Sequence, residues 1–490
     1  MQGEKSLIMD PDLKSFFHVV CPRMEAIPGK PKPEDPINDN IKDTSILEVG
    51  YNIDEKVLEQ PIILFMLKAN YKLIRVIIDL CECIPTDKRI LIIFIPQYTI
   101  TCREMFEEGK VLKRIEVHEL AFELLPLEKD VLTLDDENSF RNLALGYNFN
   151  IFSVIKHSIQ RLEALYGKIP LKFAKGKWSC TILDAMHLKE AKENDEIQSP
   201  EIDALVLMDR TVDLYSVLLT QMTYEGIVDE FFSIKTATIE VKEKIVNPET
   251  TNEGKLRTLY MTSEDDIMFK ETRDLHFNLM KEQFPKKYEE IKSVLEKKET
   301  KMSVAEMTEY VKKMRSLNIY KLKNVFHVDL NLLSYLDEQV RSQTFKQMVT
   351  MEAQAIVNEE GQKELAQSLE FEILKCREKT RLLRVLCLLS LVMNGLPKDL
   401  YNTLTKIFVE AFGISEVLRI MNLEKAGILR KDRTGSSWKS IKDTFKLIDE
   451  NTKILNPDDI RYSYTVYGPL SVRLIENLLE TGWSGSDSNV

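Results

Sequence analysis

The chain has 490 residues, of which 44% are hydrophobic and 30% charged, and its formal net charge is −11. This length exceeds what one hydrophobic core supports, so we expect about two to four domains. The acidic balance argues against a general nucleic-acid-binding protein, because such a protein needs a basic surface.

The seven cysteines and six histidines are scattered, and none has the paired spacing of a zinc site. The sequence contains no Asn-x-Ser/Thr sequon and does not start with an apolar leader, so nothing in it indicates secretion. The longest apolar runs, such as 90–95, are shorter than the ~20 residues that a membrane span needs. We therefore expect a cytoplasmic protein without a metal or other cofactor, which partners recruit to any membrane at which it works.

Strands alternate with helices in the first part of the chain, which predicts a parallel, doubly wound sheet over residues 1–123. The pattern predicts strands at 6–9, 57–67 and 89–96, and helices at 70–81 and 101–109.

An amphipathic helix is predicted at 149–166, and the apolar run 204–208 predicts a strand buried on both faces of a second parallel sheet. Asp209, Arg210 and Asp213 follow this strand, where open α/β sheets place their ligands. A phosphate-binding loop is excluded at Lys175-Gly176-Lys177, because the required earlier glycine is replaced by Leu171.

Beyond residue 234 strand patterns nearly vanish, which predicts a block of helices. The predicted helices lie at 265–277, 303–315, 329–350, 381–393 and 418–429, with the last two in a core. Strand character returns at 462–467, and a last helix starts at 469–474. This order indicates a helical block inserted into a sheet domain. Because no further apolar strand follows, we expect the carboxyl-terminal end of this sheet to be missing or supplied by a partner.

Several motifs together resemble those of one family. Asp209-Arg210, Asp213, Thr223-Tyr224-Glu225-Gly226 and Asp229-Glu230 resemble the signature of the Sec1/Munc18 (SM) family of vesicle-fusion proteins. Four stretches are similar to its vacuolar protein sorting 33 branch, namely 162–170, 384–396, 422–429 and 457–474, the last of which contains Pro469. The chain departs from the family at Ser216-Val217, where Thr-Pro is usual.

The resemblance implies an arch of three domains. Domain 1 spans 1–123, domain 2 is discontinuous and incomplete over 124–234 and 460–490, and domain 3 spans 235–459. Within domain 3, residues 235–355 face SNARE proteins and residues 356–459 face a helical tether subunit.

The resemblance also implies a binding protein and not an enzyme. Such a protein is a SNARE chaperone that binds syntaxin-like SNARE helices, as a subunit of the HOPS and CORVET tethering complexes. It is peripheral on late endosome, lysosome or vacuole membranes.

The helix at 303–315 carries an apolar seam that suits another amphipathic helix. The candidate SNARE-binding residues here are Val304, Met307, Tyr310, Val311, Met314 and Leu317. The alternative is that this seam packs on the neighbouring helix. Residues 281–323 hold 12 Lys or Arg against 7 Glu, a local charge of +5 that attracts acidic helices unless it is only a solvated face.

The charged residues after the central strand have two interpretations. Asp209, Arg210 and Asp213 suit acid–base chemistry in a nucleotide-using α/β enzyme with a helical insertion. The structural interpretation is favoured. In it a buried arginine between two carboxylates fixes the junction of the strand, the following helix and the inserted domain by bidentate hydrogen bonds. The motif from Thr223 to Gly226 is then the turn by which the chain leaves domain 2. A tether scaffold without SNARE binding is a further alternative.

Overall fold

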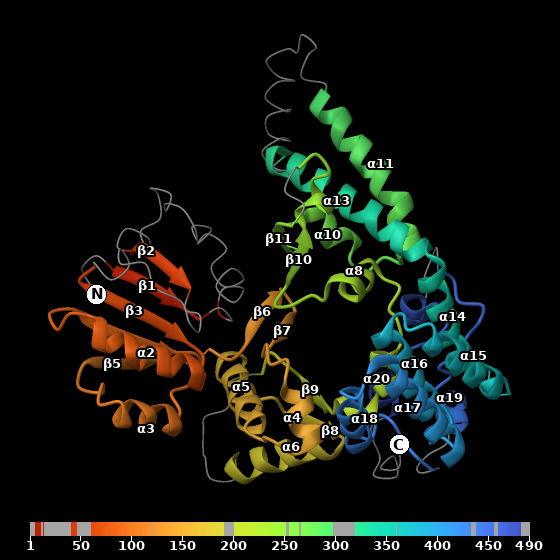
Figure 1. Cartoon of the computed structure of the whole chain (residues 1–490), viewed down its shortest axis with the longest axis horizontal. Coiled ribbons are helices and arrows are strands. Elements are labelled where there is room, and N and C mark those ends of the chain that lie inside the picture. The colour runs from red at the N-terminus through yellow and green to blue at the C-terminus, as the bar shows by residue number, and fades with distance from the viewer. Residues whose placement is uncertain are drawn as a thin grey trace. The chain divides into compact units, whose positions relative to one another are not determined.

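The computed structural model describes residues 5–10, 13, 41–46, 60–120, 122–190, 200–250, 254–263, 266–296, 319–358, 360–432, 438–454 and 459–481 (Figure 1). The chain divides into two compact units. The first comprises Met1–Asp136 with Lys235–Thr238, and the second comprises Glu137–Ile234 with Ile239–Val490.

The first unit contains a five-stranded parallel sheet of order β2-β1-β3-β4-β5. Its strands are β1 (Lys5–Met9), β2 (Ile41–Ile46), β3 (Ile62–Leu67), β4 (Arg89–Phe94) and β5 (Ile115–Glu119). Its helices are α2 (Tyr71–Cys83) and α3 (Ile100–Glu108), and β6 (Leu125–Glu128) pairs antiparallel with β7 (Val131–Thr133). This order is a doubly wound topology, as predicted.

Strand β3 shows why its sequence is continuously apolar. Ile63, Phe65 and Leu67 pack with α2 and α3, whereas Leu64 and Met66 belong to a separate cluster on the other face. A strand covered on both faces has no position for a polar residue. The prediction of strands at 57–67 and 89–96 is therefore confirmed by β3 and β4.

The second unit begins with α4 (Ser139–Leu145), α5 (Ile151–Tyr166), β8 (Leu171–Lys175), α6 (Lys177–Glu190) and β9 (Ala204–Met208). Strands β8 and β9 are parallel. Leu205 and Leu207 pack against a small cluster built from α5 and α6. The expectation of a strand buried on both faces is wrong for β9, whose residues are half-buried or exposed. Among the described residues β9 pairs only with β8.

Helices dominate the rest of the second unit. They are α7 (Leu214–Leu218), α8 (Tyr224–Phe232), α9 (Glu243–Val246), α10 (Ile267–Thr272), α11 (Phe277–Glu296), α13 (Ile319–Arg341), α14 (Gln343–Val357), α15 (Gln362–Leu374), α16 (Lys379–Val392), α17 (Lys398–Phe412), α18 (Glu416–Lys425), α19 (Trp438–Thr444) and α20 (Leu470–Thr481). Two 3-10 helices, η3 (Arg210–Val212) and η5 (Ile460–Tyr464), lie among them.

Three local predictions are corrected here. Strands β10 (Thr238–Lys242) and β11 (Leu256–Tyr260) pair after residue 234, where the sequence predicts a block of helices because strand patterns nearly vanish. The predicted helix 329–350 is two helices, because the Ser342 hydroxyl accepts the Phe345 N–H and starts α14. The predicted strand at 462–467 begins instead as η5, which the Asp459 carboxylate caps.

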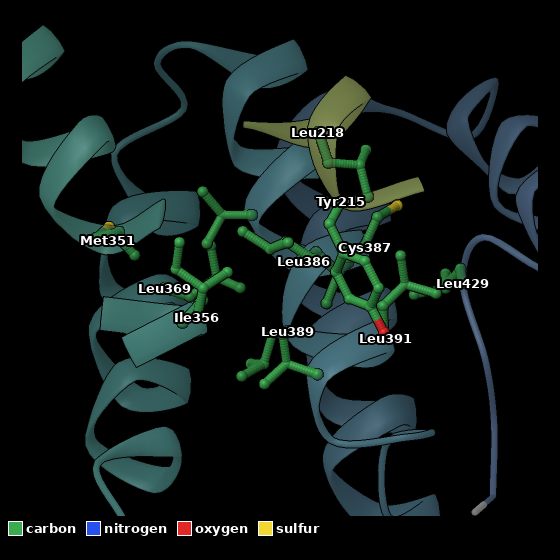
Figure 2. Packing of buried hydrophobic residues seen from close by; sticks show 14 of the residues in the cluster. Tyr215, Leu218, Met351, Ile356, Leu369, Leu386, Cys387, Leu389, Leu391 and Leu429 are labelled. Carbon is green, nitrogen blue, oxygen red and sulfur yellow. The ribbon is translucent and has the colours of Figure 1, made fainter. Parts of the chain in front are cut away.

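Helix α16 is the centre of the largest hydrophobic core, as its apolar sequence predicts. Figure 2 shows its side chains between those of α14 and α15 on one side and those of Tyr215 and Leu218 on the other. The second predicted core helix, 418–429, is different. In α18 only Glu416 and Ile420 are buried, so this helix lies at the edge of the core and exposes an apolar face.

Candidate functional site

The Asp209 carboxylate at the end of β9 lies at the N-terminus of α6. It accepts hydrogen bonds from the backbone N–H groups of Trp178 at 2.9 Å and Ser179 at 2.7 Å, and from the Ser179 hydroxyl at 2.6 Å. A helix N-terminus after a parallel strand is where α/β proteins bind a phosphate. In this chain the buried Asp209 occupies that position.

Gly176, which joins β8 to α6, lets the loop close on this carboxylate. Its φ is +101°, and a Cβ atom there would lie 2.3 Å from Cγ of Asp209. Only glycine adopts such a conformation readily and leaves this space free.

Replacing Gly176 by alanine is expected to lower the free energy of unfolding by about 1–3 kcal/mol from backbone strain alone. The clash with Asp209 adds to this loss. Urea denaturation measures the change. Gly254→Ala is the control, because a Cβ there meets nothing within 4 Å, and its effect should stay within about 0.5 kcal/mol. Equal effects of the two variants would show that the loop does not close on Asp209.

Asp213 connects α7 with the start of α20. Its carboxylate accepts from the Ser216 N–H at 3.0 Å and hydroxyl at 2.7 Å, from the Ser471 N–H and hydroxyl at 2.9 Å each, and from the Tyr467 hydroxyl at 3.2 Å. Pro469 is buried directly before α20. Asp213 and Pro469 therefore hold the start of α20 against the segment that follows strand β9.

Arg210 is placed differently from the prediction. Its side chain is exposed in η3 and has no hydrogen bond or ion pair within the described residues. The expected buried arginine between Asp209 and Asp213 is therefore wrong. Backbone N–H groups and hydroxyls satisfy both carboxylates instead, so neither needs a cation.

The motif from Thr223 to Gly226 forms the start of α8. The Thr223 hydroxyl accepts the Gly226 N–H, and Glu225 binds Arg273 through two bonds of 2.8 and 3.0 Å. Tyr224 is buried, which raises the pKa of its hydroxyl well above the ordinary value. The motif is thus a helix cap with a buried aromatic anchor, and it positions α8 for the contacts that follow.

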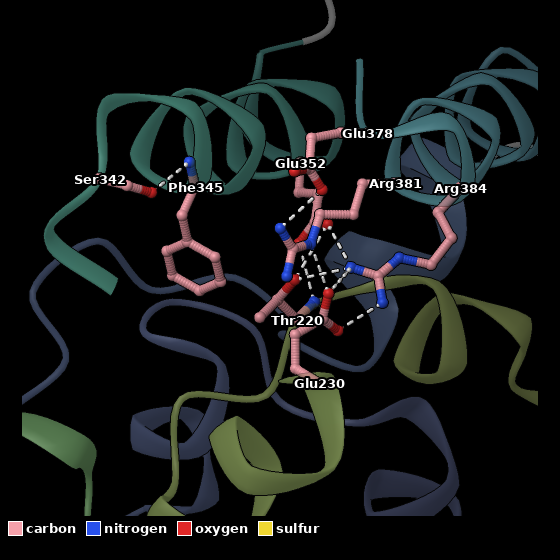
Figure 3. Close-up of polar contacts among 8 residues, drawn as sticks. All are labelled: Thr220, Glu230, Ser342, Phe345, Glu352, Glu378, Arg381 and Arg384. Atoms are coloured by element: carbon pink, nitrogen blue, oxygen red, sulfur yellow. Dashed lines mark hydrogen bonds and ion pairs between the residues drawn. The ribbon is translucent and has the colours of Figure 1, made fainter. Parts of the chain in front are cut away.

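A cluster of buried and half-buried charges joins α8, α14 and α16 (Figure 3). Glu230 accepts from Arg381 at 2.7 Å and from Arg384 at 2.6 Å, and Arg384 also reaches Glu352 at 3.1 Å. The Thr220 backbone N–H donates to Glu352 at 2.7 Å. These five residues form the charge cluster referred to below.

The two carboxyl groups of the charge cluster differ. Burial alone would raise the pKa of Glu230, but Arg384 and Arg381 hold it below the ordinary value. Burial raises the pKa of Glu352, because Arg384 offsets it only in part. The sequence alone did not indicate this cluster, although Glu230 belongs to the acidic pair Asp229-Glu230 of the family signature.

The predicted SNARE-binding residues Val304, Met307, Tyr310, Val311, Met314 and Leu317 lie outside the described residues. Helices α11 and α13, which flank them in sequence, are described. At their base Phe277, Met280 and Phe284 of α11 and Leu332 and Leu336 of α13 share one core.

Helix α18 and the turn before it present an exposed apolar face, the α18 face, which we define as Ile414 of the turn and Val417, Leu418 and Met421 of the helix. Their exposed fractions are 81%, 37%, 66% and 56%. Within α18 the spacing of three and four residues places Val417, Leu418 and Met421 on one side of the helix. On the opposite side the buried Glu416 binds Lys379 of α16 at 2.9 Å. Because Glu416 and Ile420 anchor the opposite side of α18 in the protein, the α18 face points away from the core.

Comparison with known proteins assigns the family. The Sec1 family model matches residues 5–490. The chain belongs to the Sec1 family.

Among curated relatives, the vacuolar protein-sorting-associated protein 33 homolog of Arabidopsis thaliana is 29% identical over 492 residues, covering 99% of this chain and 78% of the relative. The vacuolar protein sorting-associated protein 33A of Rattus norvegicus is 27% identical over 404 residues, covering 80% and 67%. These relatives confirm the resemblance to the vacuolar protein sorting 33 branch.

A solved structure shares the fold. The SM protein Vps45, in its complex with the Qa SNARE Tlg2, matches with a TM-score of 0.63 and 14% identity, covering 99% of this chain and 84% of that one. The predicted SM-type α/β and helical fold is thereby confirmed. Along the described residues, no helix combines the length and apolar character that a membrane span requires.

Proposed function

We propose that the chain binds syntaxin-like SNARE helices and promotes their assembly in transport to the lysosome or vacuole. It acts by binding and not by catalysis. Family membership and the vacuolar protein sorting 33 relatives support this function. The solved structure of the SM protein Vps45 supports it as well, because that protein is in complex with a Qa SNARE.

The observation that carries the proposal is the pair of helices α11 and α13. They have 20 and 23 residues and share a core at their base. The segment between them carries the apolar seam from Val304 to Leu317. A helix pair anchored at one end suits the alignment of a further amphipathic helix. We therefore assign the SNARE-facing part to 235–355.

A pull-down with SNARE motifs of late endosomes and lysosomes tests this assignment. The wild-type chain should bind, and Met307→Asp/Met314→Asp should lose binding, because two carboxylates in an apolar seam must be desolvated. Circular dichroism should show both proteins folded. If the folded wild-type chain binds no SNARE motif, the chaperone function is refuted and a tether scaffold remains.

We further propose that residues 356–459 face a helical subunit of a HOPS- or CORVET-type tethering complex, with the α18 face as the contact. Three exposed apolar side chains at helical spacing, with a fourth in the turn before the helix, form the kind of surface that an amphipathic partner helix contacts. Recruitment through such a subunit would bring the chain to late endosome, lysosome or vacuole membranes.

A further inference from the structure

The start of α11 is held by the chain that leads into α8. The Phe277 N–H donates to the Met222 carbonyl at 2.8 Å, and the Tyr224 N–H donates to the Leu275 carbonyl at 2.9 Å. The residues between these two bonds form an antiparallel bridge. The Thr-Tyr-Glu-Gly motif therefore begins as a short ladder with the residues that open α11.

Helix η5 of the returning segment contacts both strands of this ladder. The carbonyl of the buried Ser463 accepts the Met222 N–H at 2.7 Å, and the Tyr462 hydroxyl donates to the Asp274 carbonyl at 2.8 Å. Met222 thus gives its N–H to η5 and its carbonyl to α11. Asp274 lies in the turn between α10 and α11. Helix η5 therefore fixes the ladder on the side of the motif and on the side of α11.

Helix η5 is held in turn by α20. The Asp459 carboxylate caps η5, because its Oδ1 accepts the Arg461 N–H at 2.9 Å. Arg473 of α20 donates to both oxygens of the same carboxylate, at 2.7 and 2.6 Å. Burial alone would raise the pKa of Asp459, but the hydrogen bond from Arg473 holds it below its ordinary value. A charged pair with two hydrogen bonds fixes orientation as well as distance, so the position of η5 follows that of α20.

We propose that residues 459–473 form a brace that positions the start of α11, with Tyr462 and Asp459 as the positioning residues. A displacement of α20 moves Arg473, and with it the cap of η5 and both contacts of η5 with the ladder. Within the described residues the Arg473 guanidinium binds Asp459 and Glu476, so its effect on α11 passes through η5.

The brace deepens the proposed function, because α11 belongs to the helix pair assigned to SNARE binding. Its role in SNARE binding rests on that function, whereas the coupling of α20 to α11 does not. The brace is therefore tested without a SNARE.

Hydrogen exchange of the full chain, measured by mass spectrometry on peptides that cover residues 273–280, reports how often the start of α11 opens. Tyr462→Phe keeps the ring and removes one neutral hydrogen bond, so exchange should become about 2- to 12-fold faster. Arg473→Met should also accelerate exchange of these peptides at least about twofold, although Arg473 lies on α20.

The double variant separates a brace from two independent structural contacts. If Arg473 acts through η5, the effect of Tyr462→Phe/Arg473→Met should be clearly smaller than the product of the two single effects. Arg473→Lys should lie between the wild type and Arg473→Met, because an ammonium keeps the charge but not the paired hydrogen bonds.

Two variants serve as controls and should exchange at the wild-type rate. Tyr464→Phe removes a hydroxyl from the same 3-10 helix, and this hydroxyl has no hydrogen bond within the described residues. Arg377→Met removes an exposed arginine directly before α16.

A folded Arg473→Met variant with wild-type exchange at 273–280 overturns the proposal, and so do single effects that multiply in the double variant. If Arg473→Met does not fold, Arg473→Lys takes its place in both comparisons. A SNARE motif that binds the wild-type chain at the helix pair should slow exchange of the same peptides. If no SNARE motif binds, the proposed function fails, and the exchange of the variants still decides the brace.

Discussion

Replacing Arg384 by methionine is expected to lower the free energy of unfolding by about 3–5 kcal/mol. The change leaves Glu352 without its arginine partner and leaves Glu230 with Arg381 alone. Glu352 keeps its hydrogen bonds from Thr220, but the removal of its cation leaves a buried charge without compensation. Guanidinium denaturation of the purified chain measures the loss.

Arg377→Met is the matched control for Arg384→Met, because Arg377 is exposed directly before α16. Its effect should lie within about 0.5 kcal/mol. Arg384→Lys should also destabilise the protein, because a single ammonium cannot reproduce the forked contacts of a guanidinium. If Arg384→Met costs no more than Arg377→Met, the charge cluster does not stabilise the junction of α8, α14 and α16.

Leu418→Asp/Met421→Asp is expected to abolish binding to a helical tether subunit while the chain stays folded. The two side chains are 66% and 56% exposed, so their replacement removes little internal packing. An anchor residue at an interface contributes about 2 kcal/mol or more, so each change should weaken binding at least about 30-fold. Isothermal titration calorimetry with the tether subunit measures the loss.

Leu374→Asp on α15 provides the control for the α18 face, since Leu374 is 61% exposed but lies on another helix. It should bind the tether subunit as the wild type does. The thermal midpoints of both variants should match that of the wild type. Undiminished binding by Leu418→Asp/Met421→Asp would remove the α18 face from the proposed contact.

The elements that the sequence predicted well are those whose whole surface is covered. Strands β3 and β4 and helix α16 are almost continuously apolar because neighbours surround them. The expectation of a core helix at 418–429 holds only in part, because Ile420 and Leu429 are in the core whereas Leu418 and Met421 are exposed. Burial of a surface helix depends on which elements pack against it, and the sequence of that helix does not determine this.

The candidate site was predicted only in part, for a related reason. Asp209 and Asp213 were identified because charged residues after an apolar strand are conspicuous. Their partners Trp178 and Ser471 lie 31 and 258 positions away, so the contacts follow from the fold and not from local spacing. The charge cluster was missed because Glu230 and Arg384 are separated by 154 positions.

The Asp209 carboxylate at the start of α6 has a consequence for regulation. A protein that must bind a phosphate to complete its loop gains stability with the concentration of that ligand. Here the anion is covalently part of the chain, so its effective supply is constant. The closure of the loop at the start of α6 therefore needs no phosphate ligand at this position.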